Sequence, residues 1–174
     1  MARYAALLRA VNVGKRKVPM AELRELLANL GYEDVKTLLN SGNAVFDSSD
    51  SAVKISKDVE AALQKQYGFT VETVVRSISQ LKKVLKLNPL GDVAGDDSMY
   101  LVCFLAGKPD AAVKKELEGT DFSPERLTIE GNELYAWCPN KINDSPMLKV
   151  VTKSKIAEHM TARNWRTVRK IAEL

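Results

Sequence analysis

Two short turn signals, at corresponding points of the chain, constrain its fold more than any other feature. The first is Asn40-Ser41-Gly42-Asn43 and the second is Gly131-Asn132. Asn and Gly supply the backbone conformations that tight hairpin turns need. Each turn separates two short apolar stretches and therefore predicts an antiparallel strand pair. The predicted strands are Val35–Leu39, Ala44–Asp47, Arg126–Glu130 and Glu133–Trp137.

Apolar residues at helical spacing occur both before and after the first hairpin and predict two helices. One apolar strand precedes the first helix in the sequence, and another follows the second helix. Pro19 suits a first helical turn, while Gly31 and Gly68 follow the last apolar position of each helix. The resulting β-α-β-β-α-β order is that of the ferredoxin-like unit. Besides the hairpin strands, its predicted elements are strand Tyr4–Val11, helix Pro19–Leu30, helix Ser51–Tyr67 and strand Thr70–Val75.

The pattern then begins again. After a helix at Ile78–Leu87 and a Gly- and Asp-containing loop, further elements follow in the same order, but no final strand is visible. We therefore predict an α+β fold of two ferredoxin-like (βαββαβ-type) subdomains in tandem with an extra C-terminal helix. The subdomains are residues 1–88 and 99–174, with a linker at 89–98. The second half is predicted as strand Met99–Leu105, helix Pro109–Leu117, the second hairpin, a helix capped by Ser145 with Pro146 in its first turn, and a last helix from about Ala162.

Composition indicates a cytoplasmic protein. No apolar run approaches the roughly 20 residues that span a bilayer, and the N-terminal segment lacks the layout of a signal peptide. We therefore expect no membrane partner. The two cysteines, Cys103 and Cys138, are expected to be free buried thiols, with a disulfide as the alternative. Neither has a second ligand at metal-binding spacing, so no metal site is predicted.

The net charge of +4 is unevenly distributed. Residues 1–88 carry 14 basic and 9 acidic side chains, residues 89–140 carry 4 and 10, and residues 141–174 carry 8 and 3. If the two basic ends meet in space, they form a surface suited to an anionic partner. The simpler interpretation is that these charges belong to solvated helix faces.

The segment that follows the first strand is the main candidate for a binding site. Asn12-Val13-Gly14 leaves the sheet at the edge where the topology also places the hairpin tip Ser41-Gly42-Asn43. The helix that begins at Pro19 directs its free N–H groups to the same edge, which suits an anion. Lys15, Arg16 and Lys17 add positive charge, although each residue taken alone could serve only the turn or solvation.

The C-terminal helix supplies a second group of basic residues. Arg163, Arg166 and Arg169 follow one helical face, and Trp165 lies on another. Arginines on that face would complete an anion site if the helix packed near the first strand exit. The candidate ligand-binding residues are Arg9, Asn12, Gly14, Lys15, Arg16, Ser41, Gly42, Asn43, Arg163, Asn164, Trp165 and Arg166.

Four blocks of this sequence resemble the bacterial domain-of-unknown-function family 1697. They are Leu8-Arg9-Ala10-Val11-Asn12-Val13-Gly14, Val18-Pro19-Met20-Ala21-Glu22-Leu23-Arg24, Ser41-Gly42-Asn43-Ala44-Val45-Phe46 and Thr161-Ala162-Arg163-Asn164-Trp165-Arg166-Thr167-Val168. The resemblance covers nearly the whole chain. It implies a cytoplasmic protein of two ferredoxin-like subdomains, without an established activity. The family typically reads Ser-Lys-Leu where this chain has Ser145-Pro146-Met147, and Lys149 could reach the same space.

Three functions follow from these patterns. We favour binding of an anionic small molecule at the edge formed by the first strand exit, the first hairpin and the C-terminal helix. The alternatives are an electrostatic nucleic-acid-binding module and a non-catalytic partner-binding protein. The aromatic pattern of RNA-binding sheets is absent, and the single histidine, His159, completes no recognisable catalytic set. Enzymatic activity, cofactors and the oligomeric state are therefore left open.

Overall fold

The computed structural model describes all residues from Met1 to Leu174. The chain divides into two compact units, unit 1 (Met1–Lys83 with Ile171–Leu174) and unit 2 (Val84–Lys170). Each unit contains one four-stranded antiparallel sheet, and the two sheets have the same strand order in their own numbering. The fold is therefore mixed α+β with two similar tandem halves, consistent with a ferredoxin-like duplication.

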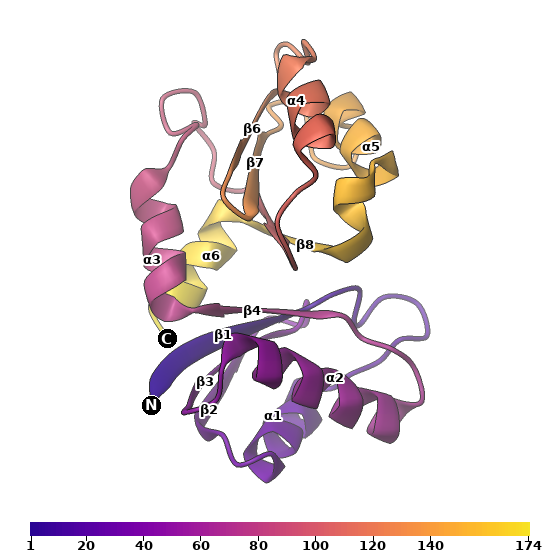
Figure 1. The fold of residues 1–174 in the computed structure, drawn as a ribbon, viewed down its shortest axis with the longest axis vertical. Helices are drawn as coiled ribbons and strands as arrows, with labels where there is room; N and C mark the ends of the chain where they lie inside the picture. Colours follow the sequence, from indigo (N-terminus) through magenta and orange to yellow (C-terminus); the bar gives the residue numbers. More distant parts are fainter. The chain divides into compact units, whose positions relative to one another are not determined.

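Unit 1 realises the predicted β-α-β-β-α-β order. Its sheet has the order β2-β3-β1-β4, and both partners of the central strand β1 run antiparallel to it. Helices α1 and α2 lie on one face of this sheet (Figure 1). The elements are β1 (Ala2–Leu8), α1 (Met20–Asn29), β2 (Glu33–Leu38), β3 (Asn43–Ser48), α2 (Ala52–Tyr67) and β4 (Thr73–Ser77).

The core of unit 1 forms between the helices and that face of the sheet. Leu23 and Leu27 of α1 pack with Ile55 and Leu63 of α2, and all four are fully buried. Tyr32 stacks on Phe46, with ring centroids 4.5 Å apart. Helix α2 begins where the Ser51 side chain accepts a hydrogen bond from the Lys54 amide, and it ends at Gly68 with a φ of 76°. These contacts fix α1 and α2 against the sheet.

The edge strand β2 is irregular. Its pairing with β3 shifts register between Glu33 and Lys36, and Asp34 between them has a φ of 46°. The Asp34 carboxylate lies 3.0 Å from Arg3 and 3.4 Å from Lys36. The outer strand of the sheet thus carries three exposed charged residues at the bulge, namely Glu33, Asp34 and Lys36.

Unit 2 repeats the strand order as β6-β7-β5-β8. Helices α4 and α5 lie on one face of its sheet (Figure 1). Helix α3 (Ile78–Leu87) leads into this unit from unit 1, and α6 (Trp165–Ala172) begins in this unit and ends in unit 1. The other elements of unit 2 are β5 (Tyr100–Leu105), α4 (Ala111–Gly119), β6 (Arg126–Glu130), β7 (Glu133–Trp137), α5 (Pro146–Lys153), the 3-10 helix η1 (Lys155–His159) and β8 (Met160–Asn164).

The predicted start of the last helix and the predicted lack of a final strand are both wrong. Residues Met160–Asn164 form β8, which pairs with β5, and α6 begins only at Trp165. Thr161 and Arg163 are buried while Ala162 between them is exposed, which is the alternation of a strand. The open edge of β5 favours the strand over the helical propensity of this segment, so Arg163 does not lie on the helical face of Arg166.

The core of unit 2 contains both cysteines as free thiols. Cys103 pairs with Leu134, whereas the Cys138 amide donates to the carbonyl of Met99, which directly precedes β5 and lies four residues before Cys103 in the sequence. This register separates their Cα atoms by roughly 13 Å at about 3.3 Å per residue, beyond the reach of a disulfide. No helix in the chain combines the length and apolar character needed to cross a lipid bilayer.

Candidate functional site

The candidate site lies where β1 leaves the sheet of unit 1. We call residues 9–19 and 39–43 together the loop edge. Strand β1 ends at Leu8, earlier than the predicted Val11, because the following backbone enters the left-handed region. Ala10, Asn12 and Gly14 have φ values of 53°, 57° and 55°. For a residue with a Cβ this conformation costs roughly 1–2 kcal/mol, so the loop is held in shape by its surroundings.

A tight turn forms the tip of the loop. The Arg16 amide donates to the Val13 carbonyl at 3.1 Å, and the Asn12 amide donates to the Arg16 carbonyl at 2.6 Å. Val13 and Arg16 therefore form an isolated antiparallel bridge, with Gly14 and Lys15 at the tip. Gly at the first central position with positive φ is typical of hairpin turns. Residues paired in this way direct their side chains to the same face of the turn.

Asn12 joins this loop to the first hairpin. Its Oδ1 accepts from the Val18 amide at 2.9 Å. Its Nδ2 donates to the carbonyls of Val18 at 3.0 Å and Asn40 at 2.6 Å. Both amide hydrogens and the amide oxygen of Asn12 are thus used within the protein. The structure gives Asn12 a positioning role at the predicted edge, and its side chain has no donor left for a ligand.

The hairpin tip is also fixed by internal contacts. The fully buried Asn43 donates from Nδ2 to the Leu38 carbonyl at 2.7 Å and to Ser41 Oγ at 3.0 Å. Gly42 has a φ of 87°, and a Cβ there would lie 2.6 Å from Cγ2 of Val11. The Leu8 amide donates to the Gly42 carbonyl at 2.8 Å. The topology-based expectation that Asn12, Ser41 and Asn43 share one end of the sheet agrees with these contacts.

Arg16 is the one cation of the loop edge whose guanidinium is held in place without a carboxylate. Its Nε donates to the Ala10 carbonyl at 3.0 Å, and its Nη2 donates to the Thr70 carbonyl at 2.5 Å. The guanidinium carbon lies 4.8 Å from the ring centroid of Phe69, which itself stacks against Tyr67. One edge and one face of the guanidinium are therefore occupied. Both N–H bonds of Nη1 and the second N–H of Nη2 have no protein partner.

The other charges near the loop edge divide into paired and unpaired groups. Arg9 forms an ion pair with Glu72 at 2.7 Å, so its charge is neutralised. Lys15 and Lys17 are exposed and form no ion pair. Elsewhere in unit 1, Lys54 bridges two aspartates. The positive charge of the loop edge therefore comes from three consecutive residues, 15 to 17.

Phe69 and Thr70 were not predicted as part of the site. They follow Gly68, which ends α2, and they position Arg16 although Thr70 lies 54 residues away from it along the chain. An aromatic residue directly after a helix-ending glycine is the only sequence signal that could have indicated them. Its partner could not be identified from spacing, because the contact depends on the loop between β1 and α1.

The remaining predicted residues belong to unit 2. Arg163 is buried on β8, where its Nη1 donates to Thr161 Oγ1 and the Ala162 carbonyl, both at 2.9 Å. Burial lowers the pKa of Arg163 to about 10. Asn164 accepts from the Thr167 amide and so caps α6, while Trp165 stacks on Tyr100. The idea that Arg163 and Arg166 complete the loop-edge site joins residues of the two units and stays a prediction.

A buried polar cluster in unit 2 was also missed. Glu125 is only 7% exposed; its carboxylate accepts from the Ser145 hydroxyl and, at 3.0 Å, from the Met147 amide. Ser145 in turn accepts from the Leu148 amide at 3.0 Å. The Cys138 thiol lies 3.8 Å from the Ser145 hydroxyl, and burial raises its pKa to about 11. The cluster caps α5 and lies beside a hollow of about 260 Å³.

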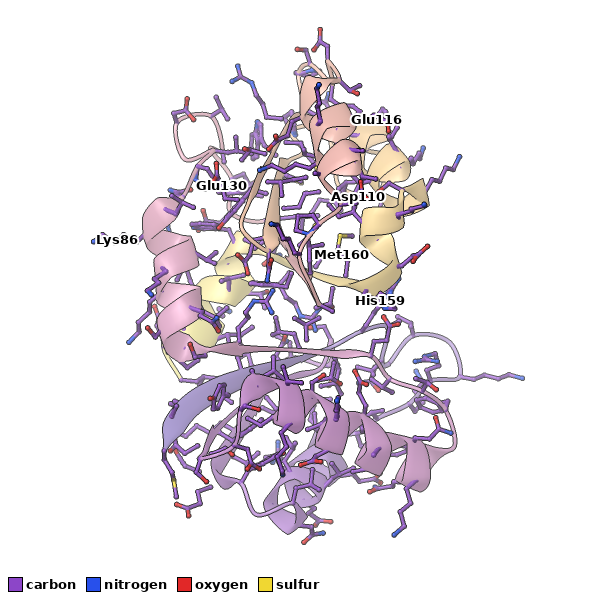
Figure 2. The ribbon with its side chains drawn as sticks, viewed as in Figure 1. Lys86, Asp110, Glu116, Glu130, His159 and Met160 are labelled. Atoms are coloured by element: carbon purple, nitrogen blue, oxygen red, sulfur yellow. The ribbon has the colours of Figure 1, made fainter.

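No side-chain cluster in the chain is arranged to hold a metal ion, since no three His, Cys, Asp or Glu residues converge suitably. His159 lies just before β8 (Figure 2). Together with Lys108 and Lys155 it lines a second hollow. Neither hollow brings together a nucleophile, a base and a group that orients the base.

Comparisons with known proteins agree with the fold. No curated protein matches the chain. A solved structure of the conserved bacterial protein SP0830 from Streptococcus pneumoniae is 30% identical, with a TM-score of 0.82, and the match covers 99% of this chain and 97% of that one. The model of a protein family of unknown function, DUF1697, matches residues 1–135. That match includes the whole loop edge, and the chain belongs to the DUF1697 family.

Proposed function

We propose that the loop edge of unit 1 binds an oxyanion, with Arg16 as the main contact. The observation that carries the proposal is the state of the Arg16 guanidinium. Its inner edge is bonded to the Ala10 and Thr70 carbonyls, and its face rests on Phe69. The outer N–H bonds of Nη1 and Nη2 form a fork that fits two oxygens of a carboxylate or phosphate group.

Prior ordering of Arg16 increases the affinity that such a fork can give. Immobilising a long side chain on binding costs about 0.5–1.5 kcal/mol, and here the protein has already ordered it. A hydrogen bond to a charged group contributes roughly 1.5–3 kcal/mol. The two carbonyl contacts leave the guanidinium fully charged, because a carbonyl does not neutralise it as a carboxylate would.

The neighbouring lysines add attraction without geometric specificity. Lys15 and Lys17 flank Arg16 and have no ion pairs. Their contribution should fall with added salt, because exposed charges are screened over about 8 Å at physiological ionic strength. Helix α1 begins nearby at Pro19, which supplies no side-chain cap for the first amides of the helix. We expect these amides to favour an anion in the same place.

The proposal concerns recognition, in the cytoplasm, of an anionic small molecule. The buried free thiols Cys103 and Cys138 support a reducing compartment. A nucleic-acid module is less well supported, because Ala5 to Leu8 of the central strand are fully buried and offer no open stacking surface.

The test is a titration with inorganic phosphate, followed by NMR of the backbone amides of residues 10–20. We expect Arg16→Gln to weaken binding by roughly tenfold or more, the loss of one charged contact. Arg24→Gln is the matched control, because Arg24 is an arginine of α1 whose guanidinium donates a hydrogen bond to Thr37 and lies outside the loop edge. An unchanged affinity in Arg16→Gln would contradict the proposal.

A second pair of variants separates position from overall charge. Lys15→Glu with Lys17→Glu should abolish binding, whereas Lys82→Glu with Lys83→Glu on α3 makes the same change in net charge elsewhere. Equal effects of the two pairs would mean that only the total charge matters.

A further inference from the structure

The loop edge contains exposed apolar groups that a simple inorganic anion does not use. Val13 is 55% exposed and Leu39 is 50% exposed. Asn12 links the two loops that carry them, through its bond to the Asn40 carbonyl at 2.6 Å. Leu39 also has a φ of 60°, a conformation that leucine rarely adopts. The hairpin tip thus holds an aliphatic side chain in solvent, in an unfavourable conformation.

Val13 belongs to the same face of the turn as the anion contact. Its bridge with Arg16 directs the two side chains to one side of the tip. The two side chains therefore leave the turn on the same side, and the Arg16 guanidinium reaches the Phe69 ring. A ligand that uses both must carry an oxyanion joined to an apolar part.

The charge of the loop edge favours a doubly charged group. Lys15, Arg16 and Lys17 provide three positive charges without an ion pair among them. A dianion gains about twice the attraction of a monoanion at the same distance. Among biological oxyanions, a phosphate monoester is a dianion above its second pKa of about 6, whereas a phosphodiester and a carboxylate stay singly charged.

We infer that the ligand of the loop edge is an organic phosphate monoester whose apolar part lies against Val13 and Leu39. This inference rests on the proposed oxyanion site and specifies its ligand class. A nucleic-acid backbone fits less well, because the nearby ring of Phe69 already carries Arg16 on one face and contacts Tyr67. It is therefore a poor platform for a base.

The experiment compares alkyl phosphates by calorimetry. Methyl and hexyl phosphate are the monoester probes, and dimethyl phosphate is the diester. We expect hexyl phosphate to bind at least threefold more tightly than methyl phosphate, since one buried methylene alone contributes about fourfold. Val13→Ser with Leu39→Ser should remove this preference, so that the variant binds hexyl and methyl phosphate with equal affinity. Val53→Ser is the control, because Val53 is 66% exposed on α2 outside the loop edge.

A pH series tests the charge of the ligand. Methyl phosphate binding should weaken severalfold between pH 7 and pH 5, as the monoester takes up its second proton. Dimethyl phosphate reports any titration of protein groups, including Glu22, which bonds Tyr67, and Glu72, which pairs with Arg9. A protein group that titrated would change both probes alike.

The outcomes distinguish this inference from the proposed function. If Arg16→Gln weakens methyl phosphate binding but hexyl phosphate shows no preference, the oxyanion site stands and the apolar contact is overturned. If dimethyl phosphate binds as tightly as methyl phosphate at pH 7, the monoester class is overturned in favour of a phosphodiester. If Arg16→Gln changes nothing, both proposals fail.

Discussion

The strand exits of the two units begin alike and then diverge. In unit 1 the Leu8 amide bonds the hairpin carbonyl of Gly42 at 2.8 Å, and in unit 2 the Leu105 amide bonds that of Asn132 at 2.9 Å. The backbone amide of the next residue in each unit donates to a carbonyl on the other side of the first strand. The Arg9 amide donates to the Glu72 carbonyl and the Ala106 amide to the His159 carbonyl, both at 2.9 Å. The repeated fold therefore presents the same two backbone positions at the end of each first strand.

After these two positions the units differ in how the first amides of the next helix are capped. In unit 2, Asp110 accepts hydrogen bonds from the amides of Ala112 and Val113 and so caps the start of α4 (Figure 2). In unit 1 a longer, left-handed loop leads to Pro19, and α1 has no side-chain cap. In unit 2 a side chain of the protein caps the first amides of α4. In unit 1 the first amides of α1 have no side-chain cap and follow three cations that form no ion pair. The proposed oxyanion site therefore belongs to unit 1 alone.

The largest expected difference in stability between the units comes from substituting the glycines of the two hairpins. Gly42→Ala would place a Cβ 2.6 Å from Val11 Cγ2 and 2.8 Å from Leu8 Cβ, at a φ of 87°. We expect a loss of about 3 kcal/mol from overpacking and backbone strain. Gly131→Ala meets nothing closer than 3.8 Å and should cost about 1 kcal/mol, from its φ alone. Urea unfolding measures both, and equal losses would disprove the asymmetry.

The two buried thiols should make unit 2 lose stability from about pH 9 upward. Burial raises the pKa of Cys103 to about 12 and that of Cys138 to about 11, from an ordinary value of 9.0. Because the folded pKa values are higher, the associated stability is complete below pH 9 and declines as pH rises toward 11–12. The decline is about 1.4 kcal/mol per pH unit for each thiol.

Cys103→Ala isolates this effect. Between pH 9 and 10 the variant should lose stability less steeply than the natural chain, while the tyrosines contribute equally to both. Urea unfolding at the two pH values measures the slopes. Parallel slopes would mean that Cys103 already ionises in the folded state.

Asn12 has no counterpart in the short exit of unit 2, so its removal should affect unit 1 alone. Asn12→Ala leaves the Val18 amide and two carbonyls without their partner and should cost about 2–3 kcal/mol. Asn12→Gly removes the same contacts but tolerates the φ of 57°, so it should cost about 1 kcal/mol less. Hydrogen exchange of the Val18 amide would locate the loss, and unchanged protection would contradict it.

The smallest effect is expected at the helix starts. Asp110→Ala should destabilise unit 2 by about 1 kcal/mol, the usual contribution of a cap. Pro19→Asp places a carboxylate at the equivalent point of unit 1, where it would cap α1 and compete with a bound anion. We expect severalfold weaker phosphate binding in a titration. Unchanged affinity would remove the start of α1 from the site.

Local patterns predicted most of the fold. The helix Ile78–Leu87 and the strands Arg126–Glu130 and Glu133–Trp137 have the predicted bounds, because their periodicity is strong and their ends carry turn residues. Strand β8 was not predicted, since five residues are too few for a clear alternation beside a helical pattern. Its conformation depends on β5, which lies far away in the sequence.

The sequence predicted where the candidate site lies but not which of its side chains are available to a ligand. Topology brings Asn12 and Asn43 to one end of the sheet, yet their side chains are used inside the protein. Sequence could not separate Arg9, which Glu72 neutralises, from Arg16, which Phe69 and Thr70 hold. Both distinctions depend on contacts between distant segments.

The bulge in β2 has a consequence for behaviour at high concentration. An outer strand normally exposes a row of amides and carbonyls that a second chain can extend. Here the register shift between Glu33 and Lys36 interrupts that row, and Asp34 adds charge at the kink. The irregular strand is a poor template for intermolecular pairing, so we expect this edge of the unit 1 sheet to resist the fibril growth that a regular β2 would favour.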